Sequence, residues 1–247
     1  MATNKTINFN FKNKKILVLG ASGGLGLKIT KDFIDSGAYV YGVSRKKIHI
    51  NSKLFNNILM DLNNISEDVL ERNLLKIKNI DFLINSYAIT EKSKLILQSS
   101  EIFEKTIKNN LFGYYNFLLK IQKKIKNNGN IVNITSINSK FAFEKNPSYQ
   151  ISKAALSSLT KSLAKDLSHR NIRVNSIAPS YIKTKMTLKS FQNNKKRNLI
   201  SNKNFLNRWG NPKEISSVVL FLCSEGASFI TGQEIFVDGG WSVNGGF

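Results

Sequence analysis

Tyr149 and Lys153 stand four residues apart in a stretch with helical periodicity. This spacing puts the phenol and the ammonium on one face of a helix, within reach of each other. An ammonium beside a phenol favours the phenolate, so the pair predicts a Tyr149 pKa below the ordinary value of about 10. Such a tyrosine can donate and accept a proton near neutral pH. Ser136 ends an apolar, strand-like run just upstream.

A glycine-rich segment, GASGGLG at residues 20–26, joins the first predicted strand to the first predicted helix. Glycines let the backbone turn tightly and approach a pyrophosphate, whose charge is stabilised by the N–H groups at the helix N-terminus. The alternative is a tight turn with a purely structural role. The position between a first strand and a first helix favours a nucleotide site.

The second predicted strand is followed by Ser44, Arg45 and two lysines. An NAD-selective fold usually carries an acidic residue here, which binds the ribose 2′-hydroxyl. A hydroxyl and a guanidinium suit a 2′-phosphate instead. The segment therefore predicts NADP(H) in preference to NAD(H), and the alternative is a solvated basic turn in a lysine-rich protein.

Short β-branched apolar runs alternate with longer amphipathic stretches, which is typical of a doubly wound parallel sheet. We expect one α/β domain over residues 1–247, a Rossmann-type sheet of about seven strands flanked by helices. The predicted strands are 15–20, 38–43, 57–60, 81–85, 130–135, 171–177 and 234–237. The predicted helices are 25–36, 99–126 with room for an interruption, 148–168 and 212–224.

Two segments do not fit the regular alternation. Residues 45–57 are short and polar, which indicates a reduced crossover rather than a full-length helix. Residues 183–208 are poorly periodic and rich in lysine and asparagine. A long irregular insert in a compact domain is usually functional, so this segment is predicted to be a substrate lid or a mobile loop.

Composition limits the possible classes of protein. The 247 residues have 41% hydrophobic content and a mean hydropathy of -0.21, as expected of a soluble globular protein. No apolar run approaches the roughly 18 residues that cross a bilayer, and residues 1–15 lack the apolar core of a signal peptide. Cys223 is the only cysteine, which excludes an intrachain disulfide and is consistent with the cytoplasm.

The formal net charge is +21, nearly all of it from lysine. Lysine rises together with asparagine and isoleucine along the whole chain, as compositional drift would produce. The sequence shows no basic tail, zinc spacing or basic strip with interleaved aromatics, so we expect neither nucleic acid nor a membrane as a partner. His49 and His169 have no carboxylate or cysteine at ligand spacing, and no metal site is predicted.

Taken in order, these features resemble the short-chain dehydrogenase/reductase family over residues 11–240. Gly20, Gly24 and Gly26 match its glycine motif, and the 13 residues from Ser136 to Tyr149 match its serine-to-tyrosine spacing. The further landmarks are Asp61-Leu62, Asn85-Ser86-Tyr87-Ala88, Asn110-Leu111-Phe112-Gly113, Asn175-Ser176-Ile177-Ala178-Pro179, Ile182-x-Thr184, Thr231-Gly232 and Val237-Asp238-Gly239-Gly240.

This resemblance implies hydride transfer between a nicotinamide cofactor and a carbonyl or alcohol. It implies that Tyr149 protonates the developing alkoxide and that Lys153 lowers the Tyr149 pKa and binds the nicotinamide ribose. Ser136 would donate to the substrate oxygen, and Asn110 would hold a helix carbonyl and a water that link Lys153 to solvent. The implied cofactor contacts are Gly20, Ser22, Gly24, Leu25, Gly26, Ser44, Arg45, Asp61, Leu62, Asn85, Tyr149, Lys153, Pro179, Ile182 and Thr184.

The sequence departs from the family pattern on the cofactor side. The departures are Leu19, Ser86, Tyr87, Ala88 and Ser180. They bear on cofactor affinity and loop geometry more than on the proton-transfer residues. Tyr87 is the largest change, and its ring is expected to narrow the adenosine or ribose channel.

Within the family, the nearest analogue is a 3-oxoacyl-[acyl-carrier-protein] reductase, whose partner is an acidic protein. Cations in the predicted lid could steer an anionic substrate or carrier. They are Lys183, Lys185, Lys189, Lys195, Lys196, Arg197, Lys203 and Arg208. A second docking patch near the cleft is expected from Arg170, Lys123, Lys124 and Lys126.

Two other functions stay open. One is a reductase or dehydrogenase of a sugar, nucleotide sugar or other small polar carbonyl, and the short crossover after Arg45 favours such a specialised member. The other is a cofactor-binding regulator without turnover, which the altered Asn85–Ala88 motif permits. The resemblance also implies a homo-oligomer, a tetramer or dimer, formed through the two helices that carry Asn110 and Tyr149.

Overall fold

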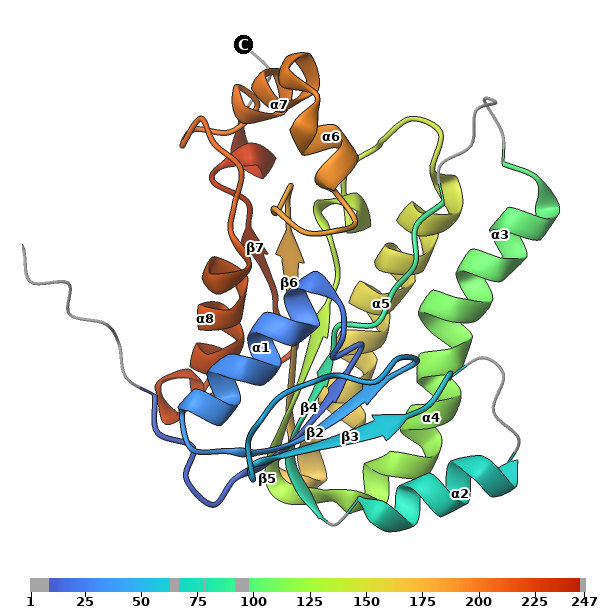
Figure 1. Ribbon diagram of the computed structural model, residues 1–247, viewed down its shortest axis with the longest axis vertical. Helices are drawn as coiled ribbons and strands as arrows, with labels where there is room; N and C mark the ends of the chain where they lie inside the picture. Colours follow the sequence, from blue (N-terminus) through green and yellow to red (C-terminus); the bar gives the residue numbers. More distant parts are fainter. Residues whose placement is uncertain (1–8, 63–66, 78, 92–97, 245–247) are drawn as a thin grey trace, which may run out of the picture.

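A computed structural model describes residues 9–62, 67–77, 79–91 and 98–244. Residues 1–8, part of the segment judged to lack a signal peptide, lie outside these ranges. The described chain forms one sheet of seven parallel strands in the order β3-β2-β1-β4-β5-β6-β7 (Figure 1). The strands are β1 Lys15–Leu19, β2 Tyr39–Ser44, β3 Phe55–Leu59, β4 Ile80–Asn85, β5 Ile125–Ile134, β6 Arg173–Pro179 and β7 Glu234–Val237.

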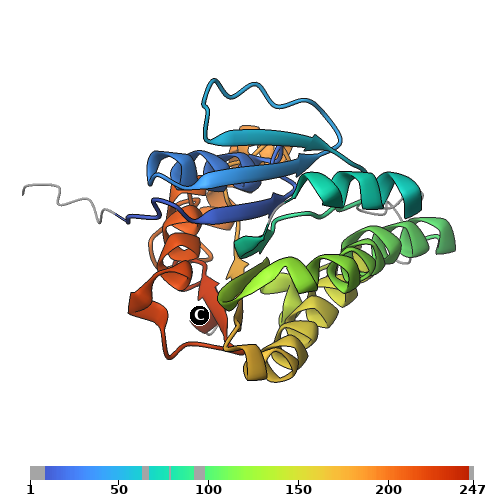
Figure 2. The same ribbon diagram turned by 90° about the horizontal axis from the view of Figure 1, so that it is seen from below.

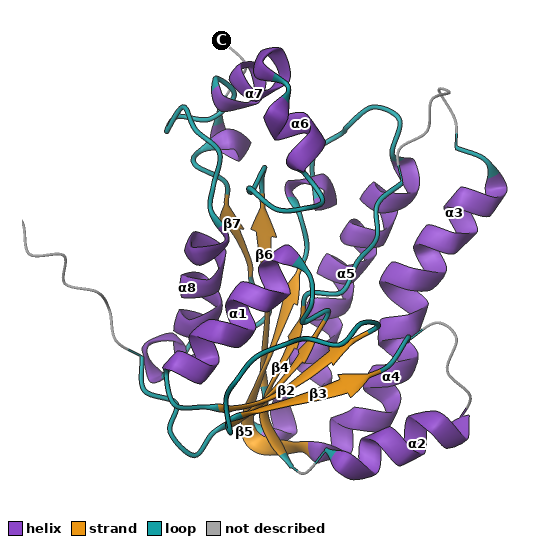
Figure 3. Cartoon of the chain, in the orientation of Figure 1, coloured by secondary structure: helices purple, strands orange, loops and turns teal. Residues whose placement is uncertain are grey.

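Helices cover both faces of this sheet, so the predicted Rossmann-type α/β fold is confirmed. Figure 2, seen from below, shows α1 (Gly24–Asp35) and α8 (Pro212–Cys223) on one side of the strands. The other side carries α2 (Glu67–Lys76), α4 (Gly113–Ile121) and α5 (Pro147–Asp166). The remaining α-helices of the described chain are α3 Ser100–Ile107, α6 Leu188–Gln192 and α7 Asn194–Ser201 (Figure 3).

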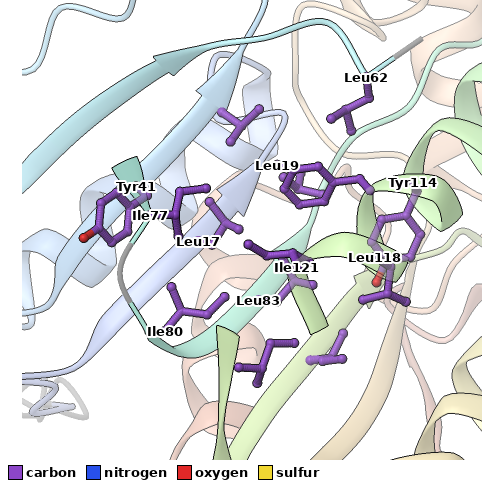
Figure 4. Packing of buried hydrophobic residues seen from close by; sticks show 14 of the residues in the cluster. Leu17, Leu19, Tyr41, Leu62, Ile77, Ile80, Leu83, Tyr114, Leu118 and Ile121 are labelled. Atoms are coloured by element: carbon purple, nitrogen blue, oxygen red, sulfur yellow. The ribbon is translucent and has the colours of Figure 1, made fainter. Parts of the chain in front are cut away.

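Strand β1 shows why the sheet is buried on both faces. Successive side chains of a strand point to opposite faces, so an unbroken apolar run supplies two cores at once. Leu17 and Leu19 pack in the core beneath α2, α4 and α5, while Ile16 and Val18 pack beneath α1 and α8. All four side chains are fully buried. Figure 4 shows the first of these cores, where Leu17 and Leu19 meet side chains of α4.

All seven predicted strands are present, six of them with shifted ends. The seventh has the predicted bounds, whereas β5 begins at Ile125, five residues before the predicted start. The early part reads KNNGN after Ile125 and has no apolar pattern. It is a strand because Ile125 pairs with Ile80 of β4. This pairing is tertiary, so local composition does not reveal it.

Helix α2 is absent from the sequence-based prediction. Most of its residues are polar, but Leu70 and Leu74 stand four residues apart, and both are buried in the first core. That i, i+4 pair is the signal that could have found the helix.

The long helix predicted over 99–126 is interrupted, as the sequence analysis allowed. Between α3 and α4 lies a π-helical turn, Lys108–Phe112, and a 3₁₀ turn, Gln122–Lys124, follows α4. Wide turns of the π type occur frequently at functional sites. This one carries Asn110 with 1% of its surface exposed.

The two irregular segments behave differently. No helix connects β2 to β3 in the described chain, which confirms the reduced crossover. The 183–208 segment, by contrast, contains the short helices α6 and α7, which its weak periodicity did not indicate. They lie beyond the ends of β6 and β7 in Figure 1. Trp209 anchors the segment, because its buried ring contacts Phe191 of α6 and Tyr181.

The docking patch predicted near the cleft is wrong. Lys123 and Lys124 lie in the 3₁₀ turn before β5, and Arg170 donates to the carbonyl oxygens of Gln122 and Ile125 there. Ile125 is the first residue of β5, whereas the cleft lies past its last residue. These cations therefore lie at the opposite end of the sheet.

The other lysines of that group have internal partners. Lys124 donates to the Ile77 carbonyl at 2.9 Å, and Lys126 pairs with Asp81 at 3.2 Å. These contacts close the amino end of the sheet. The spacing of the cations in the sequence could not show at which end of β5 they lie.

Candidate active site

A pocket of about 260 Å³ opens where the strands of the sheet end. Parallel sheets of this kind bind ligands beyond the carboxyl ends of their strands, at the point where the strand order reverses. Here that point lies between β1 and β4. The pocket is lined by Gly23, Gly24, Leu25, Ser86, Ala88, Thr90, Ile134, Thr135, Ser136, Ile137, Asn138, Phe143, Asn146, Tyr149, Lys153, Pro179, Ser180, Tyr181, Ile182, Thr184, Met186, Thr187 and Ser190.

Helix α5 brings Tyr149 and Lys153 together as predicted. It begins at Pro147, a residue whose fixed φ suits the first turn of a helix. The Lys153 Nζ lies 5.6 Å from the centre of the Tyr149 ring, and both residues line the pocket. The ammonium donates a hydrogen bond of 2.7 Å to the carbonyl oxygen of Ile134. Lys153 is only 3% exposed, so the Ile134 carbonyl accepts a hydrogen bond from a buried positive charge.

The predicted lowering of the Tyr149 pKa is wrong for this structure. Burial raises the pKa of the phenol to about 12, and a hydrogen bond with Ser136 opposes that rise only in part. The reason is geometric, because the ammonium bonds the Ile134 carbonyl and stands over the ring rather than at the hydroxyl. Burial also lowers the pKa of Lys153, to about 8. At neutral pH the pair is therefore a protonated phenol beside an ammonium.

Ser136 lies directly after β5 at the start of a 3₁₀ turn, Ile137–Ser139. Its Oγ accepts a hydrogen bond from the Asn138 N–H at 3.2 Å and donates to the Asn138 side-chain oxygen at 2.9 Å. Together with its hydrogen bond to Tyr149, these contacts place the hydroxyl in the pocket beside the phenol.

The side-chain amide of Asn110 connects two segments of the site by hydrogen bonds. Its Nδ2 donates to the Ile89 carbonyl at 2.9 Å and to the Ser152 hydroxyl at 3.1 Å, and its Oδ1 accepts from the Ile89 N–H at 2.8 Å. The amide thereby ties the segment after β4 to the residue that precedes Lys153. The link from Asn110 to Lys153 through a water stays a prediction.

The glycine turn fits a pyrophosphate. Gly20 has a φ of +74°, which L side chains rarely adopt, and a Cβ on Gly26 would stand 2.2 Å from the Gly20 carbonyl oxygen. Gly23 caps α1 without any side-chain hydrogen bond, so the first N–H groups of the helix are not capped by a side chain. Gly23 and Gly24 line the pocket. Ser22 is exposed on the same turn, and Leu25 is partly buried.

The end of β2 carries no acidic side chain. Ser44 is 5% exposed, donates to the Lys46 carbonyl at 2.6 Å and accepts from Asn57 at 3.1 Å. Its single hydroxyl proton is therefore used inside the turn. Arg45 is exposed, and among the described residues it has no hydrogen bond or ion pair. The turn presents a guanidinium where NAD-selective folds present a carboxylate.

The remaining predicted cofactor residues on this side are more buried. Asp61 is partly buried after β3, whereas the Leu62 side chain belongs to the first core. Asn85 is 1% exposed at the end of β4, and its side-chain oxygen accepts from the Tyr87 N–H at 3.2 Å.

Tyr87 lies outside this pocket, and the expectation that its ring narrows the adenosine or ribose channel stays a prediction. The ring packs against the first core, and its hydroxyl donates to Asn109 at 3.0 Å. The neighbours Ser86 and Ala88 line the pocket, while Tyr87 does not.

The last group of predicted residues closes the other wall of the pocket. Pro179 ends β6, and Ile182 is 5% exposed and forms an isolated bridge with Gly210. A Cβ on Gly24 would stand 2.7 Å from the Thr184 Cβ, so this threonine lies against the glycine turn. The segment that begins at 183 thus starts in contact with the nucleotide-binding turn.

Several pocket residues were not found from the sequence. Thr90, Asn138, Phe143 and Asn146 line the pocket, and Asn146 donates to Thr90 at 2.9 Å. Asn138 could have been found from its position two residues after Ser136. The others come from loops, where no periodic signal exists.

Two classes of site have no support in the described part of the chain. No group of three His, Cys, Asp or Glu side chains there could hold a metal ion. Among the helices described, none has the length and apolar character needed to span a bilayer.

Comparison with known proteins decides the family. A family model described as enoyl-(acyl carrier protein) reductase matches residues 20–242. A 3-oxoacyl-[acyl-carrier-protein] reductase of Thermotoga maritima is 35% identical over 243 residues, which span 93% of this chain and 98% of that protein. The chain belongs to the short-chain dehydrogenase/reductase family. This dehydrogenase/reductase is thus an NAD(P)-dependent oxidoreductase.

Other members of the family agree with the fold. A 3-oxoacyl-[acyl-carrier-protein] reductase of Rickettsia conorii is 37% identical over 238 residues, covering 92% of this chain and 96% of that one. A solved 4-hydroxyisoleucine dehydrogenase, complexed with NADH, has a TM-score of 0.83 at 31% identity and covers 94% of this chain and 99% of its own. The aldohexose dehydrogenase of Thermoplasma acidophilum gives a TM-score of 0.83 at 30% identity, with 96% of each chain covered.

The buried Lys153 makes a prediction about stability. An unfolded lysine has a pKa of 10.5, against about 8 in the folded protein. Between these two pH values the unfolded state binds more protons than the folded state, so the contribution of Lys153 to stability rises with pH. Below pH 8 both states carry the ammonium, and the folded protein bears the whole free-energy cost of burying it. We expect Lys153→Met to raise the midpoint of thermal unfolding at pH 7, and this gain to shrink as the pH rises from about 8 to about 10.5.

The measurement is thermal unfolding of the cofactor-free protein at each pH. Lys161→Met is the control, because Lys161 is exposed on the same helix. A gain that stays constant across this pH range, or a lower midpoint at pH 7, would contradict the assignment of a buried ammonium.

Proposed function

We propose that this protein is an NADPH-dependent reductase that converts a carbonyl to an alcohol on an acyl chain bound to a carrier, as 3-oxoacyl-[acyl-carrier-protein] reductases do. The observation that carries the proposal is the convergence of Ser136, Tyr149 and Lys153 on one pocket beside the glycine turn. The names of the relatives from Thermotoga maritima and Rickettsia conorii support the substrate class.

The protonation states suit reduction. A phenol with a pKa of about 12 holds its proton at neutral pH, and a proton donor is what a developing alkoxide needs. With substrate bound, the Ser136 hydroxyl would turn its proton from the Asn138 side-chain oxygen to the same substrate oxygen and stabilise its growing charge. The positive charge of Lys153, 5.6 Å from the ring centre, then offsets part of the charge on the phenolate, although burial keeps the pKa of the phenol high. When bound, the nicotinamide supplies the hydride, which no side chain can.

The residues present fit a dinucleotide, and each predicted contact has a place in the proposal. The glycine turn and the N-terminus of α1 would hold the pyrophosphate, and Lys153 would bind the nicotinamide ribose. Arg45 supports NADP(H), since it is exposed and free of internal bonds among the described residues, and Ser44 shapes the turn that presents it. The other proposed contacts are Ser22, Leu25, Asp61, Leu62, Asn85, Pro179, Ile182 and Thr184.

The 183–208 segment is proposed as the substrate lid of a single domain spanning 1–247. Its exposed cations support an acidic carrier as the partner. They are Lys183, Lys185, Lys189, Lys195, Lys196 and Lys203. Arg208 is excluded from this set, because it forms an ion pair of 2.6 Å with Glu214. Arg197 is only partly exposed and stands 5.6 Å from the centre of the Phe191 ring. Exposed apolar side chains on the same segment, among them Leu199 and Phe205, offer contact area between the charges.

A second candidate is the reduction or oxidation of a small polar carbonyl such as a sugar. The observation that favours it is a set of polar side chains that line the same pocket as Ser136, namely Thr90, Asn138 and Asn146. The aldohexose dehydrogenase among the solved structures agrees with this alternative. A silent regulator is less favoured, since the proton-transfer residues are all in reach of one another.

We further propose a homo-oligomer in the cytoplasm, with dimers or a tetramer formed through α4 and α5. Four large apolar side chains on this side of the molecule are more than 40% exposed, which supports an interface there. They are Phe112, Tyr115, Leu119 and Ile151. The buried free thiol of Cys223 is compatible with a reducing compartment.

The test of function is loss of NADPH absorbance with three substrates: an acetoacetyl group on acyl carrier protein, the same group on the small neutral thiol N-acetylcysteamine, and a panel of sugar carbonyls. We expect turnover with both thioesters. The KM for the carrier-bound substrate should rise with salt and in Lys196→Glu, because both weaken attraction between charges. The neutral thioester is the control and should not respond to either change.

Turnover of sugars without thioesters would replace the proposed function by the second candidate. No turnover of any carbonyl, together with intact NADPH binding, would favour the silent regulator.

Cofactor preference rests on Arg45. Hydrogen bonds to charged groups contribute about 1.5–3 kcal/mol, so Arg45→Ala should raise the KM for NADPH about 10- to 100-fold. The KM for NADH should stay nearly unchanged. Lys53→Ala is the matched control, since Lys53 is an exposed cation on the same crossover. Equal changes in the KM for both cofactors would contradict the 2′-phosphate assignment.

A further inference from the structure

Glu234 stands on β7, and its carboxylate holds the turn that carries Ser136. The Thr135 hydroxyl donates to Glu234 Oε1 at 2.6 Å. The Ser139 hydroxyl lies 3.1 Å from both carboxylate oxygens. Thr135 and Ser139 lie on either side of Ser136 in the sequence, so one carboxylate fixes both ends of the short turn.

These contacts cross the sheet. Strand β7 pairs with β6, where Glu234 lies opposite Ser176, and β6 in turn pairs with β5. The Glu234 side chain therefore reaches from one strand, past β6, to the residues that follow β5. Thr135 is also tied to β6 through its N–H, which donates to the Ile177 carbonyl at 2.8 Å.

The bond from Thr135 has the length of a charge-assisted hydrogen bond. O–H donors bond carboxylates at about 2.5–2.7 Å, and such bonds are roughly twice as strong as neutral ones. Glu234 is partly buried, which reduces competition from water. The same hydroxyl also lies 2.9 Å from the Ile177 carbonyl oxygen, so its one proton is shared between that carbonyl and the closer carboxylate.

Ser136 itself bonds Asn138 inside the same turn and Tyr149 across the pocket. The Glu234 contacts are to its neighbours in the turn. Any displacement of the turn would move the Ser136 hydroxyl relative to the phenol. Displacements of about 1 Å can cost about 100-fold in rate when a catalytic group must be aligned.

We propose that Glu234 is a positioning residue for the reaction, which acts by holding the Ser136 turn in register with Tyr149. The inference rests on the proposed function, because it assigns Ser136 a part in the reaction. It adds a residue on the far edge of the sheet that the glycine, serine, tyrosine and lysine motifs do not include.

The first test is a set of kinetic variants. Glu234→Val should lower kcat about 10-fold or more, with the KM for NADPH nearly unchanged. Glu234→Gln should recover most of the rate, because its amide oxygen still accepts from Thr135. Gln233→Val is the matched control, since Gln233 is exposed next to Glu234. If Glu234→Val does not fold, Ser139→Ala removes contacts with the same carboxylate from the other side and should also lower kcat.

A double-mutant cycle separates positioning from general stability. If Glu234 acts through Ser136, then Glu234→Val should change kcat by less than about 2-fold once Ser136→Ala is already present. Full additivity of the two substitutions would overturn the inference. So would a Glu234→Val rate equal to that of the wild type.

The second test needs no turnover. Backbone hydrogen exchange of the segment 135–141 should speed up in Glu234→Val and stay near the wild-type rate in Glu234→Gln and Gln233→Val. Unchanged exchange in Glu234→Val would overturn the inference whatever the activity. A third outcome is possible, in which the wild-type protein reduces no carbonyl and Glu234→Val still exchanges faster than the wild type. That outcome would refute the proposed function and the catalytic part of this inference, and Glu234 would be only a structural restraint on the turn.

Discussion

The site depends on a charge that the fold buries. The Lys153 ammonium lies at the end of β5, bonded to the Ile134 carbonyl and 5.6 Å from the Tyr149 ring. Burial of an ammonium costs free energy, and its lowered pKa is the measure of that cost. The surroundings hold it in place, because Asn110 ties Ser152 to the segment after β4. Lys153 thus lowers the stability of the fold, and the buried amide of Asn110 helps to hold the helix that carries it. Such a loss of stability is common where a residue is kept for activity.

The order of elements could be predicted from the sequence, because it follows from local patterns. Strand β1 is an unbroken apolar run, and the turn after it contains glycines that a Cβ would not fit. The i, i+4 spacing of Tyr149 and Lys153 needed only a helix to bring the two side chains together. Each of these features is decided within a few residues, and each was correct in the structure.

The features that failed depend on contacts between distant residues. Burial raises the Tyr149 pKa, and the Lys153 ammonium bonds a carbonyl of β5, which spacing along a helix cannot show. Arg170 follows α5 and so lies at the end of the sheet opposite the pocket. The Tyr87 hydroxyl donates a hydrogen bond to Asn109, 22 residues away, which the sequence pattern did not indicate. Glu234 reaches the Ser136 turn across 99 residues of sequence.

The central claim is that Tyr149 transfers the proton, and removal of its hydroxyl tests it most directly. In Tyr149→Phe, NADPH should bind with nearly unchanged affinity by fluorescence titration, while oxidation of NADPH by the carbonyl substrate should fall at least about 100-fold. Tyr181→Phe is the control, because Tyr181 lines the same pocket and should keep its activity. Tyr149→Phe with a rate near that of the wild type would contradict the account.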